Sequence, residues 1–299
     1  MELKKLDELV QIAKSGKTKR LVVAAAADEP VLEAVCAARR EKIIEPILVG
    51  NKAEILKIAE KLNLQISDVE IIDEPDDVKA SAMAVKVIRE GRAEILMKGL
   101  VQTGTLLKAV LDKENGLRKG SLLSHFALME SPFYHKLIAL SDGGVNIAPT
   151  FEEKVVILEN SVEAFHKLGY ECPKVAVVGA VETVNPKMEA TIHAAMLSQM
   201  NYRKQIKKCK VDGPFALDNA VSKEAAKHKG IESEVAGDAD LILVPDINAG
   251  NILYKCLGFL GNATSAAVIM GAKVPIVLTS RADSDKSKMM SIALAAAMK

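Results

Sequence analysis

The stretch Val274–Lys288, VPIVLTSRADSDKSK, places reactive side chains directly after an apolar run that is typical of a buried strand. The hydroxyl, guanidinium and carboxylate groups that follow the run belong to Thr279, Ser280, Arg281, Asp283 and Asp285. Arginine is always charged and binds phosphate through two N–H groups, whereas a structural arginine pairs with a carboxylate. The stretch therefore predicts either an anion site with a general base beside it, or a helix start in which Arg281 pairs with Asp283 or Asp285.

A second candidate anion site follows the run EILMKG, in the segment LVQTGTLLKAVLD. Lys98 ends the run, and Thr103, Thr105 and Lys108 occupy the start of the expected helix. Unpaired backbone amides, hydroxyls and the positive end of the helix dipole together make a phosphate cradle. A threonine that only caps the helix is the alternative.

A third polar cluster follows the run DLILVPD, in the segment INAGNILYKCLG. It contains Asn248, Gly250, Asn251 and Lys255. Polar groups at the junction of a buried strand and a helix need hydrogen-bond partners. A ligand, a helix cap and a contact between domains would each supply such partners.

Other catalytic patterns are missing from the sequence. The five histidines have no metal-ligand or triad spacing, and only His125 and His135 lie in a segment of interest, KGSLLSHFALMESPFYHK. The four cysteines lie far apart and are interpreted as reduced thiols. No dinucleotide fingerprint, P-loop or Gly-x-Ser-x-Gly elbow is found, so we expect no bound metal and no permanently bound cofactor.

Short β-branched runs alternate with longer helical patterns, which predicts α/β architecture with mostly parallel sheets. The expected strands are LVVAAAA, EPILVG, VEIID, EILMKG, KLIALSDGGV, KVAVVGA, KCKVDGPF, DLILVPD and VPIVLTS. The expected helices include 30–40, 78–90, 151–168, 188–203 and 217–229. Ligands of such sheets collect outside the carboxyl ends of the strands, where all three polar clusters fall.

Composition narrows the possible partners. The 40 basic residues nearly balance the 39 acidic ones, which argues against a nucleic-acid or membrane partner. No apolar stretch approaches the length of a membrane span, and the N-terminal MELKKLDELVQIAKSGK reads as an amphipathic helix rather than a signal peptide. We therefore expect a cytoplasmic protein with an aliphatic core.

The length of 299 residues suggests about two domains. The segment KGSLLSHFALMESPFYHK interrupts the alternation and is expected to carry the chain from one domain to the other. The final helix, SKMMSIALAAAMK, is expected to return to the first domain. The predicted division is residues 1–128 plus 283–299 for the first α/β domain and residues 129–282 for the second.

Three long blocks carry a family resemblance: MKGLVQTGTLLKAVLD, ALSDGGVNIAPTFEEKVVILENSVEAFHKLG and VPDINAGNILYKCLGFLGNATSAAVIMGAKVPIVLTSR. Together they resemble the phosphate acyltransferases, the phosphate acetyltransferase and phosphate butyryltransferase family, from Glu94 to the C-terminus. The block TGTLLKAVLD and the ending TSRADSD…SIALA resemble the butyryl branch. The resemblance implies reversible acyl transfer between coenzyme A and phosphate, with CoA as a substrate, and a homo-oligomer.

The resemblance also implies a fold and site residues. The fold is that of isocitrate and isopropylmalate dehydrogenases, two three-layer α/β/α domains with the active site in the cleft between them. Ser280 and Arg281 would hold the phosphoryl group, and Asp285, ahead of Asp283, would take the proton of the CoA thiol, since the acetyl branch uses the position of Ser287. At the fourth strand Lys108 replaces an arginine.

Direct attack of the CoA thiolate on the acyl phosphate is the expected mechanism, since no nucleophile with an attendant base is evident. A carboxylate of ordinary pKa near ~4 is a weak base for a thiol near ~8.5, so the loop must assist. A Cys256 acyl-enzyme is the alternative within this class. Phosphate acetyltransferase or another short-chain or branched-chain acyltransferase, an NAD-linked decarboxylating dehydrogenase and a non-catalytic CoA-binding protein are the other candidates.

Overall fold

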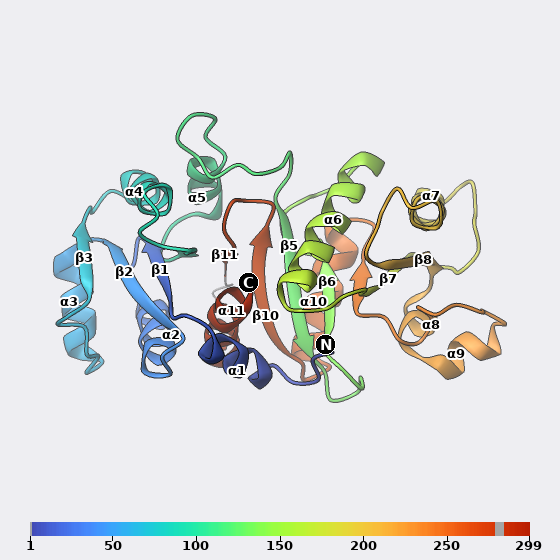
Figure 1. Ribbon diagram of the computed structural model, residues 1–299, viewed down its shortest axis with the longest axis horizontal. Coiled ribbons are helices and arrows are strands. Elements are labelled where there is room, and N and C mark those ends of the chain that lie inside the picture. Colours follow the sequence, from blue (N-terminus) through green and yellow to red (C-terminus); the bar gives the residue numbers. More distant parts are fainter. Residues whose placement is uncertain (1, 279–283) are drawn as a thin grey trace. The chain divides into compact units, whose positions relative to one another are not determined.

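The computed structural model describes residues 2–278 and 284–299, which form two compact units. The terminal unit contains residues 7–121 and 266–299, and the middle unit contains residues up to 6 and 122–265. In Figure 1 the blue N-terminal strands and the dark red C-terminal helix belong to the same unit. Ser280, Arg281 and Asp283 lie outside the described residues.

The terminal unit is built on a mostly parallel sheet. Its strands are β1 (Lys19–Ala24), β2 (Ile44–Gly50), β3 (Glu70–Asp73), β4 (Ile95–Lys98), β10 (Thr264–Met270, whose first two residues fall in the middle unit) and β11 (Ile276–Val277). They follow the order β3-β2-β1-β4-β11-β10, parallel except for the β10–β11 pair. This confirms the predicted α/β class for the unit.

Six helices accompany this sheet. They are α1 (Asp7–Ser15), α2 (Glu29–Arg40), α3 (Lys52–Lys61), α4 (Asp77–Arg89), α5 (Thr103–Val110) and α11 (Asp285–Ala297). α11 packs against α1 and α2, and α4 packs against α5. Almost all of α11 is buried, which explains why its sequence is apolar around most of its circumference.

The middle unit also has a mostly parallel sheet. Its strands are β5 (Ser124–Glu130), β6 (Ile138–Ser141), β7 (Lys174–Val178), β8 (Lys210–Phe215) and β9 (Leu241–Leu243), in the order β5-β6-β9-β7-β8. Only β5 is antiparallel to its neighbour in this order. After β8 the chain turns back, and β9 inserts between β6 and β7. Connections that run in opposite directions across a parallel sheet place their helices on opposite faces.

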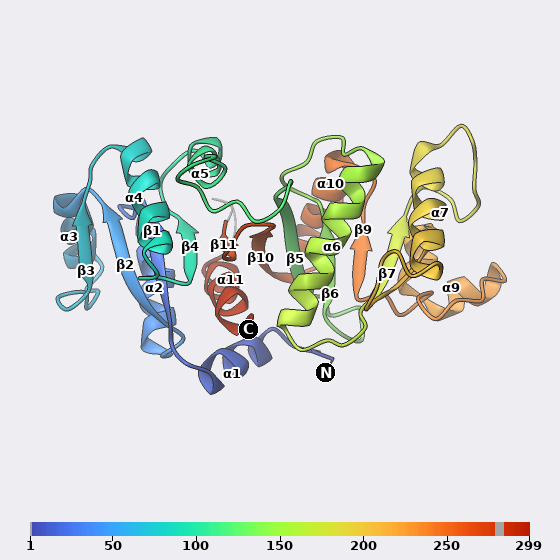
Figure 2. The ribbon, with the colours of Figure 1, turned by 45° about the horizontal axis from the view of Figure 1, so that its top comes forward.

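The helices of the middle unit are α6 (Phe151–Lys167), α7 (Glu189–Tyr202), α8 (Leu217–Val221), α9 (Lys223–His228) and α10 (Ile247–Phe259). Figures 1 and 2 both show α6 on one face of the sheet and α10 on the other. No helix among the described residues combines the length and the apolar character that a membrane crossing requires.

The structure differs from the sequence prediction at two strands and one helix. β5 and β10 were not predicted, because SHFALME and TSAAVIM are buried almost throughout and lack the alternation that marks a half-buried strand. The helix expected over 217–229 is two short helices. Ser222 separates them in an extended conformation and accepts a hydrogen bond from the Ala225 amide, which starts α9.

The same two strands set the unit boundaries. β5 pairs with β6, so residues 122–128 cluster with the middle unit, and β10 pairs with β11, so residues 266–278 cluster with the terminal unit. Two divisions between the units therefore fall after residues 121 and 265, and a third falls after residue 6, where the sequence analysis placed two, after 128 and 282.

Candidate active site

The start of α5 is the candidate anion site of the terminal unit. Gln102 is the N-cap residue and makes no side-chain capping bond. In the described part of the chain, the amides of Thr103 and Gly104 have no backbone partner and the hydroxyls of Thr103 and Thr105 make no hydrogen bond. The threonines therefore do not serve as caps. Their free donors at the positive end of a helix suit an oxyanion.

The loop before α5 is fixed to its neighbours. The amide of Gly99 donates to Ala24 O at 2.8 Å, and a Cβ on Gly99 would lie 2.1 Å from Ala25 O, so only glycine fits. The Lys98 ammonium donates to the carbonyls of Gly99 and Val101 at 3.1 and 3.0 Å. Lys98 thus braces the loop, whereas Lys108 is exposed in the last turn of the helix.

Asp285 is the first residue of α11, and its side chain is 78% exposed. The cap of the helix is Ser284, whose hydroxyl accepts from the Ser287 amide at 3.1 Å. The Asp285 carboxylate lies 3.9 Å from the Lys288 ammonium. It is therefore not needed as a cap, and its exposure leaves it accessible to a substrate thiol. Ser287 is the position to which the resemblance assigns the base of the acetyl branch. It is buried, and its hydroxyl and amide bond to the Ser284 hydroxyl.

In the middle unit the glycine-rich loop after β6 is organised by Asp142, which the sequence analysis did not single out. Asp142 is 3% exposed. One carboxylate oxygen accepts from the amides of Gly144 and Val145, and the other accepts from the amide of His125 and from the amide and side chain of Asn146. An SDGG sequence reads as a turn, so only the fold shows that the carboxylate ties the loop together.

The third polar cluster, on α10, divides into two kinds of residue. Gly250 packs on the loop after β6, because a Cβ there would lie 2.8 Å from Asp142 O and 2.9 Å from Gly143 Cα. Asn251 donates its side-chain amide to Gly143 O at 3.1 Å. Asn248 and Lys255 are exposed and are the members of the cluster that remain available to a ligand.

The two histidines of the segment KGSLLSHFALMESPFYHK have different surroundings. His125 is buried, with its ring against Gly144 and at 5.9 Å, edge-on, from the ring of Tyr254. His135 is exposed and contacts Asp238 at 2.8 Å, near the amino ends of the strands. His125 therefore lies next to the loop after β6, whereas His135 lies at the opposite end of the sheet.

A pair that sequence reasoning missed lies at the carboxyl ends of the strands of the middle unit. The Lys154 ammonium of α6 lies 2.9 Å from Nδ1 of His193 on α7. Burial, followed by the charge of Lys154, lowers the pKa of His193, and burial lowers the pKa of Lys154. Their separation of 39 residues gives no sequence signal for the contact.

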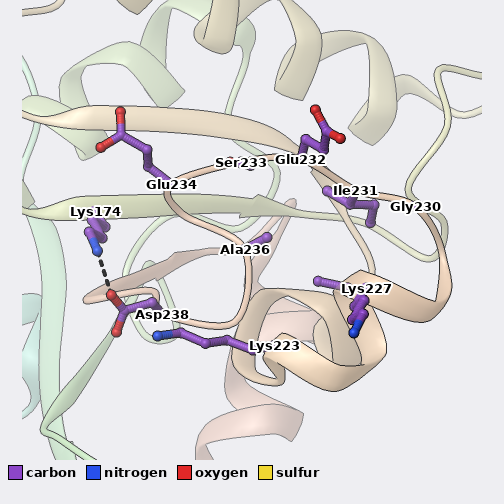
Figure 3. Close-up of a pocket in the computed structure, with 11 residues that line it drawn as sticks. Lys174, Lys223, Lys227, Gly230, Ile231, Glu232, Ser233, Glu234, Ala236 and Asp238 are labelled. Carbon is purple, nitrogen blue, oxygen red and sulfur yellow. Dashed lines mark hydrogen bonds and ion pairs between the residues drawn. The ribbon is translucent and has the colours of Figure 1, made fainter.

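A polar hollow of about 510 Å³ lies at the amino ends of β7 and β9 (Figure 3). Lys174, which begins β7, points to Asp238 and is paired with it, and Lys223 and Lys227 come from α9. Parallel sheets bind ligands at their carboxyl ends, so this hollow is not our candidate site. In the residues described, no group of three or more His, Cys, Asp or Glu side chains is arranged to hold a metal ion.

Comparison with known proteins assigns this chain to a family. The family model described as "phosphate acetyl/butaryl transferase" matches residues 5–82 and 77–296. The chain belongs to this family of phosphate acyltransferases. It is 52% identical to a phosphate acetyltransferase of Thermotoga maritima, over 97% of this chain and 98% of the relative. It is 48% identical to a phosphate butyryltransferase of Clostridium acetobutylicum, over 98% of both chains.

A solved structure of the same family has a similar fold. A branched-chain phosphotransacylase from Enterococcus faecalis superposes with a TM-score of 0.83 at 35% identity, over 93% of this chain and 98% of that one. The resemblance drawn from the sequence is thereby confirmed, and the chain is an acyltransferase enzyme of the phosphate acetyl/butyryl class. Phosphate acyltransferases use CoA as a substrate, so the α5 cradle and the exposed Asp285 suit the anions and the thiol of this reaction.

Proposed function

We propose that this phosphate acyltransferase acts on short-chain acyl groups, with butyryl preferred: butyryl-CoA and phosphate give butyryl phosphate and CoA, reversibly. The observation that carries the phosphate part is the start of α5, directly after β4, where two amides and two hydroxyls make no hydrogen bond among the described residues. The butyryl preference is supported by the likeness of TGTLLKAVLD and TSRADSD to the butyryl branch and by the phosphate butyryltransferase relative.

The proposed roles follow the needs of the reaction. Thr103, Thr105 and Lys108 bind phosphate oxygens, and Lys98 shapes their loop. Ser280 and Arg281 hold the phosphoryl group, and lie outside the described residues along with Asp283. Asp285 takes the proton of the CoA thiol as the thiolate attacks the acyl carbon, and the C–O bond to phosphate breaks.

In the middle unit, Asn248 and Lys255 are proposed to contact substrate. Gly250 and Asn251 act on binding through the loop after β6, because Gly250 packs against Gly143 and the side chain of Asn251 donates to the Gly143 carbonyl. The proposal includes a cytoplasmic homo-oligomer. Ile252, Phe259 and Leu260 on and beside α10 are each more than two thirds exposed, which supports an association surface and would be checked by light scattering.

Release of CoA from a series of acyl-CoAs with phosphate tests the chain length. We expect kcat/KM to peak at butyryl, with each missing methylene costing up to ~0.8 kcal/mol, about fourfold. A maximum at acetyl-CoA would instead make the chain a phosphate acetyltransferase, as the Thermotoga relative is named. A maximum at a branched acyl group would place it with the Enterococcus relative.

The same substrates separate direct transfer from an acyl-enzyme. Labelled CoA exchanges into butyryl-CoA without phosphate only if the enzyme holds the acyl group covalently. We expect no exchange, because direct thiolate attack in a ternary complex needs phosphate or acyl phosphate. Exchange that disappears in Cys256→Ser would contradict direct transfer and assign the nucleophile to this exposed cysteine.

A further inference from the structure

Two lysines of the middle unit are almost fully buried, yet their surroundings differ. Lys136 is 2% exposed and its ammonium lies 2.8 Å from Asp240 and 3.1 Å from Asp238. Lys154 is 4% exposed, and no carboxylate oxygen of the described residues lies within 4.0 Å of its ammonium. Its hydrogen-bond partner is Nδ1 of His193, a neutral acceptor when the proton is on Nε2.

A buried ammonium without a counter-ion is costly to the fold. Taking a charge out of water costs several kcal/mol unless an opposite charge and hydrogen bonds offset it. Lysine carries three N–H donors, and the imidazole of His193 accepts one of them. Burial lowers the pKa of Lys154, and the charges of Glu189 and Asp246 act in the opposite direction. Both carboxylates lie beyond ion-pair distance from the Lys154 ammonium. Lys154 is thus suited to a negative partner that none of the described residues supplies.

The position of the pair fits a ligand rather than a structural ion pair. Lys154 is the fourth residue of α6, the helix that follows the loop after β6. His193 is the fifth residue of α7, which follows β7, and Asp246 caps α10 directly after β9. All three lie after the carboxyl ends of parallel strands, where sheets of this kind bind their ligands. Helix starts there also favour anions.

We propose that Lys154 is an anion-binding residue whose partner is a phosphate oxygen of the substrates, either of CoA or of inorganic or acyl phosphate. His193 is a positioning residue that holds the ammonium through Nδ1. The proposal rests on phosphate acyl transfer by this chain and is independent of the preference for butyryl. The family resemblance assigned no role to Lys154 or His193.

The test is direct binding to Lys154→Met, which keeps the length of the side chain and removes its charge. The control is Lys167→Met in the last turn of the same helix, where the lysine is 30% exposed and pairs with Glu163. Calorimetry with CoA, dephospho-CoA and inorganic phosphate is expected to show at least about tenfold weaker binding of one ligand to Lys154→Met. Lys167→Met is expected to bind all three like the wild type.

The set of ligands that bind Lys154→Met more weakly identifies the phosphate group that Lys154 contacts. Weaker binding of CoA alone assigns the 3′-phosphate, weaker binding of CoA and dephospho-CoA assigns the pyrophosphate, and weaker binding of inorganic phosphate assigns the transferred group. The melting temperature of Lys154→Met is expected to equal or exceed that of the wild type, because an uncompensated buried charge has been removed. A structural lysine would instead give a lower melting temperature with unchanged affinities, which would overturn the proposal.

A measurement on the wild type keeps the proposal testable if Lys154→Met does not fold. The imidazole resonances of His193, identified by comparison with His193→Gln, are expected to shift when the assigned ligand is added. No shift with saturating CoA, dephospho-CoA or phosphate would refute the proposal. Because binding is measured without turnover, a failed acyl-chain preference would leave this result unaffected.

Discussion

At the scale of single residues, the most heavily bonded carboxylate outside the site is Asp238. It contacts Lys174, His135 at 2.8 Å and Lys136 at 3.1 Å, and its side chain is 17% exposed. Burial raises its pKa, but the hydrogen bonds of Lys174, His135 and Lys136 outweigh burial and hold the pKa well below the usual range. Asp238 therefore joins three basic side chains at the amino ends of the strands.

This network predicts a pH-dependent contribution to stability. Since the folded pKa of Asp238 is depressed, its contribution is fully present above the unfolded value near ~4 and is lost as pH falls toward the folded value. Asp238→Asn is expected to lower the free energy of unfolding by about 3 kcal/mol at pH 7. The difference from the wild type should shrink in urea titrations below about pH 4.

The control for this effect is Glu234→Gln. Glu234 lies on the same segment as Asp238 and forms an exposed pair with Lys210, so a much smaller change in the free energy of unfolding is expected. A constant difference between Asp238→Asn and the wild type from pH 7 to pH 3 would contradict the assigned ionisation.

Residue types in the sequence predicted part of the site but not its contacts. Thr103 and Thr105 were predicted as anion ligands or caps; Gln102 holds the cap position, so the cap role is wrong and the anion role stays a prediction. Lys154 and Asp142 gave no signal. A lysine in an amphipathic helix normally points to solvent, and an aspartate before two glycines normally makes a turn, so burial by distant segments was needed to give them other roles.

At the scale of elements, α10 packs closely on the loop after β6 in the candidate site. Gly250 is buried against Asp142 and Gly143 through backbone atoms, and Asn251 adds a hydrogen bond to the same loop. Backbone atoms have no rotamers by which to retreat, so the junction depends on the missing side chain.

Gly250→Ala is expected to displace the loop and lower both stability, by about 1–3 kcal/mol, and kcat/KM. Its matched control is Gly258→Ala in the same helix, where an added Cβ meets nothing within 4 Å. This control should stabilise the protein by about 0.5–1 kcal/mol through helix propensity and leave kcat/KM unchanged. Urea unfolding and CoA release measure both; equal effects of the two variants would contradict the close packing.

Element types were more predictable than element edges. Parallel strands flanked by long amphipathic helices were evident from hydrophobic periodicity. β5 and β10 were hidden, because a strand buried on both faces has no alternation, and the break at Ser222 was hidden because a serine within a helical pattern is also compatible with a continuous helix.

At the scale of the whole molecule, the terminal unit is assembled from two distant segments of the chain. Residues 266–299 supply β11 beside β4 and α11 against α1 and α2. Leu294, in the last turn of α11, is fully buried. The stability of this unit therefore depends on the last residues of the sequence.

Leu294→Ala is expected to destabilise the terminal unit by about 2–5 kcal/mol, because it leaves a cavity between α11 and its neighbours. Leu56→Ala on α3, where the leucine is 44% exposed, is the matched control and should cost much less. Limited proteolysis should cut Leu294→Ala first within 7–121 or 266–299. First cuts within 122–265 would contradict the division into units.

The sequence by itself determined the fold class and the family, and it supplied the stretches that carry the proposed site residues, because periodicity, composition and contiguous motifs are local properties of the chain. Only the tertiary structure decided which polar residues lack partners. It separated Lys154, buried beside a neutral imidazole, from Lys136, buried between two carboxylates, since both environments are made by residues from other strands and helices. Burial and charge compensation depend on contacts between distant segments, and spacing along the chain does not record them.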